Sequence, residues 1–224
     1  MFQLKSKNSG ITLGNIFLLI FTFALIFLTP IFPEATHRIV KNILFSAIFF
    51  LAILSLKGKI KKRILIIAII AFVTEWIAEL FNLTVLRYIS SFTNVIFFQI
   101  IVIRLIFQIA RSKEVNAGVI LESVNAYLLL GLMFTMLVAI VHLYNSESFN
   151  FIESKDVNFQ HYIYYTFVTI STLGYGDVTP QGDIGKSLAI LISVSGQLYI
   201  AIIIAMLVGK FSGSMTALKE NKDK

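Results

Sequence analysis

The sequence predicts an all-α integral membrane protein with six transmembrane helices and one short re-entrant helix that is followed by a loop. Composition gives the first indication: 57% of the 224 residues are hydrophobic and 14% are charged, whereas soluble domains are about 25% charged. Spacing gives the second, because the apolar residues gather in runs close to the roughly 20 residues that a helix needs to cross a membrane. The third is a segment between the last two runs that is too polar at its start to be a span and too apolar in its middle to be an ordinary loop.

Six apolar runs, bounded by charge or proline, are the expected spans. In chain order they cover residues 11–32, 39–56, 64–86, 92–110, 117–144 and 184–209. The first run also fits a signal peptide, because Lys5 and Lys7 precede it, but it is long and no small-residue cleavage site follows it. We therefore expect a span there as well. The absence of Cys excludes disulfide scaffolds and thiolate sites.

The distribution of basic residues predicts the orientation of these spans. With the amino terminus inside, 13 of the 19 Lys and Arg residues lie on the inner side, Arg104 lies within the fourth run, and five lie outside. Those five are Arg38, Lys41, Arg87, Lys155 and Lys186. Because basic residues gather in cytoplasmic loops, we expect a multi-pass protein of the plasma membrane with both termini in the cytoplasm.

One basic cluster has two compatible interpretations. It consists of Lys57, Lys59, Lys61, Lys62 and Arg63, between the second and third runs. As a topology signal it holds this loop in the cytoplasm, and as a binding site it attracts anionic lipid headgroups of the surrounding membrane. Nucleic acid is not an expected partner, because the positive charge lies in short loops between apolar runs rather than on a folded polar surface.

The segment between the fifth and sixth runs carries the chemistry. Its residues from Asn158 to about Ser171 favour a helix too short to span a membrane, which indicates a re-entrant element entering from outside. Irregular backbone at membrane depth is tolerated only where protein buries it or where it lines a water-filled path. Gly174 and Gly176 permit backbone dihedrals closed to other residues, so the carbonyl groups of residues 172–176 can all face one axis. Such a column of oxygens replaces the hydration shell of a cation.

Residues 172–177 read Thr-Leu-Gly-Tyr-Gly-Asp and resemble the filter signature of the potassium channel family, Thr-(Val, Ile or Leu)-Gly-Tyr-Gly-Asp. Gly-Tyr-Gly alone occurs in ordinary turns, whereas six matching residues behind a short apolar helix and between two spans are specific. The resemblance implies a K⁺ site built from one hydroxyl and from backbone carbonyl oxygens, contributed by Thr172, Leu173, Gly174 and Tyr175. It also implies that Gly176 shapes the outer mouth and that Asp177 braces the filter from behind.

The resemblance has further implications for the assembly and for the filter's support. Because one subunit supplies one filter strand, it implies a homotetramer, with K⁺ as the permeant ion and with no catalysis and no organic cofactor. Tyr164 and Tyr165 occupy positions where the family often has paired tryptophans, so they are expected to pack around the filter and to brace Tyr175. Interfacial anchoring by aromatic residues is the other interpretation of these two tyrosines.

The sixth run contains the expected gate. Gly196 lies 20 residues beyond Gly176, the spacing at which family members place a hinge glycine in the inner helix. Close packing between helices is the alternative role for this glycine, because small residues let transmembrane helices approach. Ile204 and Val208 are candidates for an apolar constriction that closes the pore by dewetting.

The first half resembles a voltage sensor in architecture but not in charge. We expect a four-helix, voltage-sensor-like domain over residues 1–116, a pore domain over 117–210 and a short cytoplasmic tail over 211–224. Arg104 is the one arginine within the fourth run, and counting from it by threes meets only apolar residues, so strong voltage dependence is not expected. Glu75 and Glu79 lie one turn apart in the third run and predict an ion pair with Arg104; a residual sensor and a proton-titrated switch remain open.

The sequence therefore predicts a potassium-selective channel that conducts K⁺ passively and is weakly or not voltage-gated. A non-selective cation channel and a genuinely voltage-gated K⁺ channel are the alternatives. A transporter built on pore loops would need four such loops in one chain, and this chain has one. A non-conducting membrane scaffold also remains open.

Overall fold

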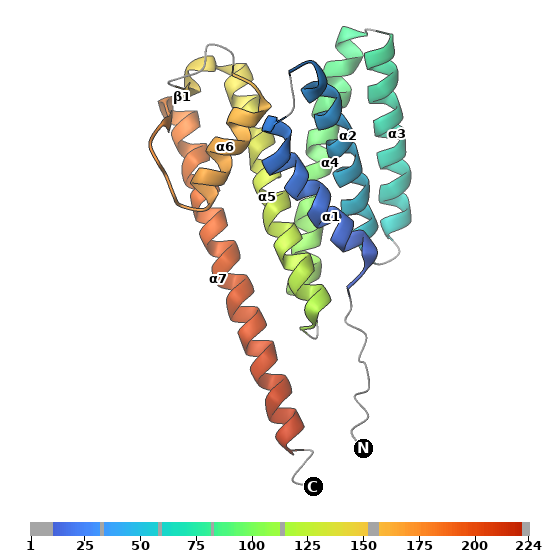
Figure 1. The fold of residues 1–224 in the computed structure, drawn as a ribbon, viewed down its shortest axis with the longest axis vertical. Coiled ribbons are helices and arrows are strands. Elements are labelled where there is room, and N and C mark those ends of the chain that lie inside the picture. Colours follow the sequence, from blue (N-terminus) through green and yellow to red (C-terminus); the bar gives the residue numbers. More distant parts are fainter. Residues whose placement is uncertain are drawn as a thin grey trace.

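The computed structural model describes residues 11–31, 34–57, 60–81, 83–112, 115–151 and 157–220. Helices dominate these ranges (Figure 1), and they are α1 (Leu13–Phe23), α2 (Glu34–Ser55), α3 (Ile60–Leu80), α4 (Thr84–Ala110), α5 (Ala117–Tyr144), α6 (Phe159–Ile170) and α7 (Gly182–Glu220). A π-helical segment (Ala24–Leu28) and a 3₁₀ turn (Thr29–Ile31) follow α1. A second 3₁₀ turn (Ser146–Ser148) precedes strand β1 (Phe149–Phe151), and strand β2 (Val178–Pro180) precedes α7.

The predicted helical class is confirmed, and within the described residues three stretches are long and apolar enough to cross a membrane. They are Phe92–Ala110 in α4, Ala117–Tyr144 in α5 and Gly182–Met206 in α7. Shorter apolar stretches occupy Leu13–Leu28 and Ile43–Ser55. The protein is thus a membrane protein, while the number six stays a prediction.

The predicted boundaries of the third and fourth runs differ from the helices. The apolar run over residues 64–86 was expected to form one span, but α3 ends at Leu80 and α4 begins at Thr84. Leu83, Val85 and Leu86 are apolar, so hydropathy alone does not separate the start of α4 from the end of α3. The fourth helix is therefore longer than the run that predicted it.

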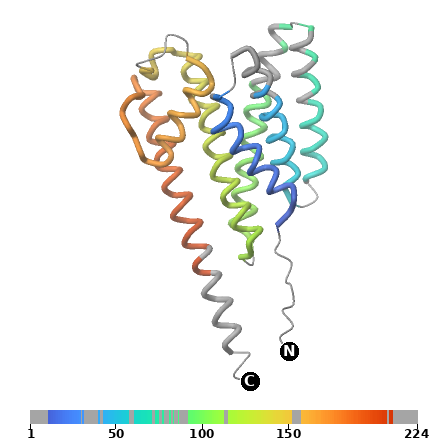
Figure 2. Tube along the Cα trace, in the orientation of Figure 1, coloured from blue at the N-terminus to red at the C-terminus, as the bar shows by residue number. Residues whose placement is uncertain are grey.

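Helix α5 lies at the centre of the molecule. It contacts α1 and α4 on one side and α6 and α7 on the other, and Figures 1 and 2 show it between these two groups. Helix α2 packs on α1 and α4, and α3 packs on α4 and α2. The buried core runs through these contacts and includes Leu18, Ile48, Phe98, Ile101, Leu129 and Ile192. Helix α1 begins at the end opposite α6, and α7 runs away from α6 toward that same end (Figure 1).

The π-helical segment after α1 holds the start of α6. A π-helical turn changes the i→i−4 hydrogen-bond pattern and leaves backbone carbonyl groups to other donors. Here the side-chain amide of Gln160 donates to the Ile26 carbonyl oxygen at 3.1 Å, and the Thr29 hydroxyl donates to the Gln160 Oε1 at 3.0 Å. The Thr29 hydroxyl also lies 2.6 Å from the Leu25 carbonyl oxygen. The first turn of α6 is thereby tied to the π-helical segment and the 3₁₀ turn that follow α1.

A short antiparallel ladder joins the segment before α6 to the segment after the predicted filter. Residues Phe149, Asn150 and Phe151 of β1 pair with Pro180, Thr179 and Val178 of β2. The Gln181 amide extends this connection by donating to the Ser148 carbonyl oxygen at 2.8 Å. No pattern in the sequence predicted this ladder, which closes the loop that contains residues 171–177.

Candidate functional site

Helix α6 forms close to where the sequence predicts a short helix, between residues 158 and 171. Asn158 caps its start, because its side-chain oxygen accepts from the Gln160 amide at 2.9 Å. The His161 side chain reaches back to the Asn158 amide at 3.1 Å, which completes a capping box. A capping box satisfies two backbone donors at once and fixes the residue at which a helix begins. The position of the segment that follows α6 depends on this start.

Helix α6 packs against α5, and the approach is especially close at Gly131. A Cβ atom added at Gly131 would lie 2.7 Å from Cε1 of the Phe167 ring, closer than real Cβ contacts allow. The ring thus occupies the space that a side chain at position 131 would need. This contact determines how closely α6 approaches α5.

The last four carbonyl groups of α6 all have donors. Ser171 donates to the Phe167 carbonyl oxygen through its amide (3.2 Å) and its hydroxyl (2.6 Å). The Gly174 amide donates to the Val168 carbonyl oxygen at 3.3 Å, and the Thr172 amide donates to the Thr169 carbonyl oxygen at 3.0 Å. The Tyr127 hydroxyl lies 3.5 Å from the Ile170 carbonyl oxygen. Helix ends normally leave four such groups without intrahelical partners. These hydrogen bonds therefore hold the first residues of the predicted filter against the end of α6.

The backbone of the predicted filter is left-handed at three positions. The φ angles are 62° at Thr172, 55° at Gly174 and 83° at Gly176. Glycine adopts this region freely, whereas a β-branched residue such as threonine does so only when its surroundings impose it. On a single chain residues 171–177 are all exposed, with Leu173 at 61% and Tyr175 at 68% of their maximal accessible surface.

Tyr164 and Tyr165 have different surroundings, although they are adjacent. The Tyr164 hydroxyl donates a short hydrogen bond to the Asp177 carboxylate, so this tyrosine connects α6 to the end of the predicted filter. The Tyr165 side chain is buried, and its ring packs against Phe149 with centroids 5.0 Å apart. Among the described residues its hydroxyl has no hydrogen-bond partner. Of the two, Tyr164 makes the polar contact to the loop.

The hydrogen bond shifts the pKa values of both partners. It raises the pKa of Tyr164 from 10.0 to about 12 and lowers the pKa of Asp177 below 3.8. Because the tyrosine pKa is raised, the stability that this bond contributes is fully present below pH 10 and is lost as the pH rises through about 12. Because the aspartate pKa is lowered, the same stability is present above pH 3.8 and is lost as the pH falls through the lowered pKa. The contact is therefore intact across the neutral range.

Replacement of Tyr164 with Phe is expected to loosen the loop, because it removes a hydrogen bond to a charged acceptor. In the predicted channel, conduction during sustained opening should decline roughly several-fold faster than in the native protein. The matched control is Tyr165→Phe, which removes a hydroxyl that has no partner among the described residues and should leave the decline unchanged. Currents recorded from purified protein in planar bilayers measure both rates. An equal effect of the two substitutions would contradict a specific role for Tyr164.

Helix α7 passes directly behind the end of α6. A Cβ atom added at Gly196 would collide with the Ile170 carbonyl oxygen and would lie 2.6 Å from Ile170 Cγ1. Helix α7 continues without interruption past this glycine. Close packing therefore accounts for Gly196 in this structure, and its role as a hinge stays a prediction. Ile204 and Val208, the predicted constriction, are both exposed on the single chain.

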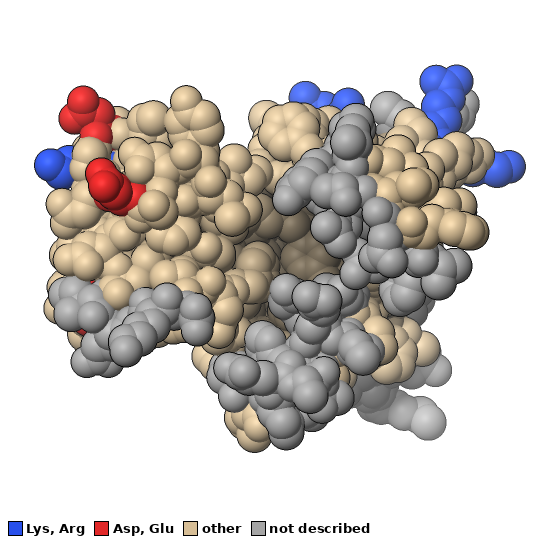
Figure 3. Space-filling view, turned by 90° about the horizontal axis from the view of Figure 1, so that it is seen from above, with Lys and Arg blue, Asp and Glu red and all other residues tan. Residues whose placement is uncertain are grey.

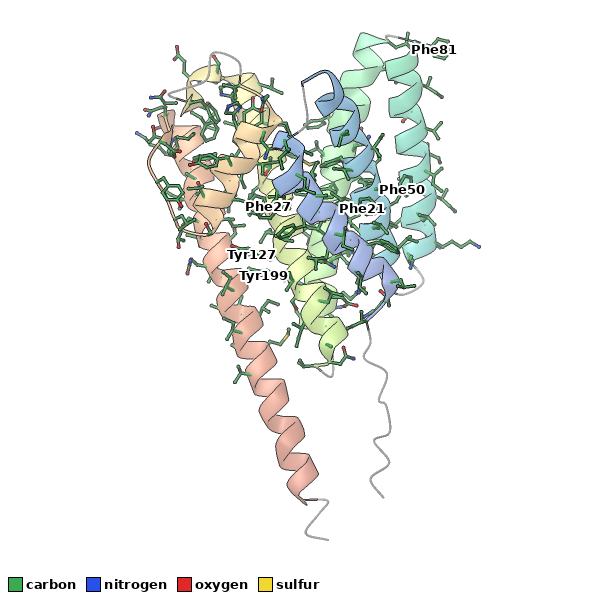
Figure 4. The ribbon with its side chains drawn as sticks, viewed as in Figure 1. Phe21, Phe27, Phe50, Phe81, Tyr127 and Tyr199 are labelled. Carbon is green, nitrogen blue, oxygen red and sulfur yellow. The ribbon has the colours of Figure 1, made fainter. Side chains whose placement is uncertain are left out.

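Two tyrosines join α5 and α7 near this contact, and Figure 4 labels both. The rings of Tyr127 and Tyr199 have centroids 5.7 Å apart. The Tyr199 hydroxyl donates to the Ser123 carbonyl oxygen at 2.7 Å. One residue after Gly196, the side-chain amide of Gln197 donates to the Thr172 hydroxyl oxygen at 3.4 Å. Sequence reasoning missed Gln197, although an amide within an apolar run was visible in the sequence.

A buried polar network at the opposite end of the molecule was also missed. Glu122 on α5 is 6% exposed and pairs with the Lys57 ammonium at 2.8 Å. The Asn15 side-chain amide donates to the Glu122 carboxylate at 3.3 Å, while its oxygen accepts from the Ser55 hydroxyl at 2.6 Å. Asn125 donates to the Asn15 carbonyl oxygen at 2.8 Å. The sequence feature that could have revealed this network is the carboxylate of Glu122 inside an apolar run, because such a carboxylate should be assumed to have a partner.

The predicted charge sites of the first four helices have mixed outcomes. The side chains of Glu75 and Glu79 lie outside the described residues, so their pairing with Arg104 stays a prediction; Arg104 itself is exposed on α4. Within the basic cluster Lys57 pairs with Glu122, and the Lys61 ammonium donates to the Leu54 carbonyl oxygen. Lys62 and Arg63 are exposed, and Lys59 lies outside the described residues.

Acidic side chains lie over the part of the molecule that contains α6 and α7. Figure 3 shows them beside basic atoms on the surface seen from the α6 end. The exposed residues Glu147, Asp177, Asp183 and Lys186 belong to this part. Negative charge around a pore mouth raises the local concentration of cations. Among the described residues of this part, exposed Lys186 lies among three exposed acidic side chains, so the local charge is on balance negative.

Comparison with known proteins identifies the segment that contains this site. Residues 126–212 match the family model described as "Ion channel". The A-type voltage-gated potassium channel KCND3 of Rattus norvegicus and that of Homo sapiens are each 41% identical over 59 residues, which are 26% of this chain and 9% of theirs. The potassium voltage-gated channel protein Shal of Drosophila melanogaster is 45% identical over 49 residues, 22% of this chain and 9% of that protein. No solved structure matches the chain.

These similarities are distant and partial. The chain matches about a tenth of the length of each of these relatives. Residues 126–212 extend from α5 through α6 and the predicted filter into α7. This segment is therefore an ion channel domain, and the matched family is one of channels rather than of enzymes.

Proposed function

We propose, with the ion channel domain over residues 126–212 as the premise, that this protein is a potassium-selective channel that conducts K⁺ passively. The observation that carries the proposal is the loop at residues 172–177. It begins at the end of α6, has the sequence Thr-Leu-Gly-Tyr-Gly-Asp, and places glycine at two of its three left-handed positions. The printed names of the relatives, which are potassium channels, support the same choice of ion.

The proposed mechanism uses backbone dipoles rather than charged side chains. Dehydrated K⁺ moves in single file between sites formed by the Thr172 hydroxyl and by the carbonyl oxygens of residues 172–175. The carboxyl end of α6 carries the partial negative charge of the helix dipole, which favours a cation beside it. Ions move down their electrochemical gradient, so the cycle contains no chemical step.

Assembly as a homotetramer completes the site. One chain supplies a single filter strand, and a ring of strands is needed to surround an ion. The exposure of the whole loop at residues 171–177 on the single chain leaves its backbone available to neighbouring subunits. In the tetramer the four strands line one axis, and α7 of each subunit lines the path below them.

The rest of the chain is proposed to form a voltage-sensor-like unit over residues 1–116, with the pore over 117–210 and a cytoplasmic tail over 211–224. Six spans place both termini in the cytoplasm of a cell whose plasma membrane holds the channel. Ile204 and Val208 form the apolar gate, and Lys62 and Arg63 are available to anionic lipid headgroups. With Arg104 as the single arginine of the fourth run, voltage dependence is weak or absent.

Replacement of Gly174 with Ala tests the filter. Gly174 has a φ of 55°, and an L residue there costs roughly 1–2 kcal/mol in each of the four subunits. We expect the preference for K⁺ over Na⁺ to fall at least about ten-fold. The measurement is the flux of each ion from liposomes that contain the purified protein.

The matched control is Gly182→Ala. Gly182 has a φ of 59° and open space around it, as Gly174 does, but it lies at the start of α7 outside the filter. This variant should retain the native preference for K⁺. Equal fluxes of K⁺ and Na⁺ through the native protein would favour the non-selective alternative, and unchanged selectivity in Gly174→Ala would contradict the proposed filter.

A further inference from the structure

We infer that Gln197 is a positioning residue for the innermost K⁺ site, acting by a hydrogen bond from its side-chain amide to the Thr172 hydroxyl. This inference rests on the proposed channel function. The donor and the acceptor come from different elements, α7 and the loop after α6, and lie 25 positions apart in the sequence. The distance from Nε2 to Oγ1 is 3.4 Å.

The backbone beneath Gln197 is fixed by its neighbours. Gly196 lies against the Ile170 carbonyl oxygen, two residues before Thr172, at a distance that leaves no room for a Cβ atom. The Tyr199 hydroxyl holds the next turn of α7 to α5 through the Ser123 carbonyl oxygen at 2.7 Å. Helix α7 is thus held on both sides of Gln197. The amide reaches Thr172 from a rigid support, which is the condition for a side chain to position another group.

Thr172 is the residue in this loop that most needs such support. Its φ of 62° places a β-branched residue in the left-handed region, where strain persists only if the surroundings over-determine the conformation. One constraint is the bond from its own amide to the Thr169 carbonyl oxygen at 3.0 Å. The bond from Gln197 is a constraint on its side chain. Together they hold the backbone and the hydroxyl of the same residue.

The chemistry of the hydroxyl allows it to serve both partners. A threonine hydroxyl oxygen has two lone pairs, so it can accept from the Gln197 amide and still offer one lone pair to a cation. The amide is neutral, so its effect comes from orienting this lone pair rather than from adding charge. In the tetramer four amides would hold four hydroxyl groups around the innermost site. A cation bound there senses all four.

Block of the channel by Ba²⁺ applied from the inner side measures ion binding at this site. Ba²⁺ is a divalent ion close to K⁺ in size. In planar bilayers the Gln197→Leu variant should bind internal Ba²⁺ about five-fold more weakly than the native channel. The effect is modest although four hydrogen bonds are lost, because each orients a hydroxyl group rather than contacting the ion. In the Thr172→Val background, which lacks the hydroxyl, Gln197→Leu should change Ba²⁺ affinity less than about two-fold. Calorimetric titration of the purified proteins with Ba²⁺ gives the same cycle for any variant that does not conduct.

The matched control is Ser195→Ala, on the same helix two residues from Gln197, which should leave Ba²⁺ affinity unchanged. The inference is overturned if Gln197→Leu binds Ba²⁺ as the native protein does. It is also overturned if the substitution weakens binding equally with and without the Thr172 hydroxyl, because the effect would then be general to the pore. If either result is found while the native protein conducts K⁺ selectively, this inference alone is wrong. If the native protein shows no selective flux, the proposed function is wrong.

Discussion

Replacement of Gly196 with Ala is expected to displace α7 from the end of α6 and to abolish selective conduction. The added methyl group would meet the Ile170 carbonyl oxygen, and Ile170 Cγ1 would lie only 2.6 Å away. A backbone carbonyl cannot turn aside as a flexible side chain can, so one of the two helices must move. Overpacking of this kind costs roughly 1–3 kcal/mol, and each subunit of a tetramer would contribute that amount. Because Ile170 is two residues from Thr172, the displacement acts directly on the filter.

Gly209→Ala is the matched control for this substitution. Gly209 lies on the same helix with nothing within 4 Å of an added Cβ atom, so helix propensity alone would raise stability slightly. The thermal midpoint of the purified protein should fall in Gly196→Ala and stay the same or rise in Gly209→Ala. The hinge hypothesis gives a different result, in which Gly196→Ala leaves stability and selectivity unchanged and alters only the open probability. That outcome would contradict the packing role.

Replacement of Glu122 with Leu is expected to destabilise the contact between the first helices and α5. Glu122 is 6% exposed and accepts from Lys57 and Asn15, so the apolar side chain leaves the Asn15 amide without this acceptor. An unmade hydrogen bond of a buried polar group costs roughly 1–3 kcal/mol. The Lys57 side chain is 63% exposed, so its loss of a partner adds at most about 1 kcal/mol after solvent screening. We expect a total loss of roughly 2–3 kcal/mol.

Glu122→Gln separates the two contributions. Glutamine keeps the oxygen that accepts from Asn15 and removes only the charge that pairs with Lys57. Its loss should stay below about 1 kcal/mol, as for other partly exposed ion pairs. Unfolding of the purified protein in detergent by denaturant measures both variants. Equal losses in Glu122→Leu and Glu122→Gln would show that the ion pair dominates and would contradict this assignment.

The sequence predicted the site in more detail than the fold around it. The short helix was predicted from residues that are neighbours in the sequence, Asn158 to about Ser171, and α6 begins and ends within a residue of these limits. The break between Leu80 and Thr84 contains one polar residue, Asn82, but hydropathy does not mark it because apolar residues lie on both sides. Pairing of β1 with β2 depends on residues about 30 positions apart whose sequences are short and irregular. Only the folded chain brings them together.

Contacts between distant residues explain why part of the site was also missed. Gln197 and Thr172 meet because Gly196 lets α7 approach the end of α6, and the sequence alone gave the glycine two roles. Glu122 finds Lys57 and Asn15 only when α1, α2 and α5 are packed. Tyr164 was expected to brace Tyr175, and this role stays a prediction; the contact that its hydroxyl makes is with Asp177. Specific side-chain partners are set by packing, which periodicity does not encode.

The reversal potential of the native protein tests the central proposal most directly. Purified protein in a planar bilayer is recorded with K⁺ on one side and an equal concentration of Na⁺ on the other. A carbonyl-lined filter predicts a reversal potential displaced by many tens of millivolts toward the K⁺ equilibrium value. A reversal potential near zero would show that the loop at residues 172–177 does not discriminate between the two ions, and it would contradict the proposal of a potassium-selective channel.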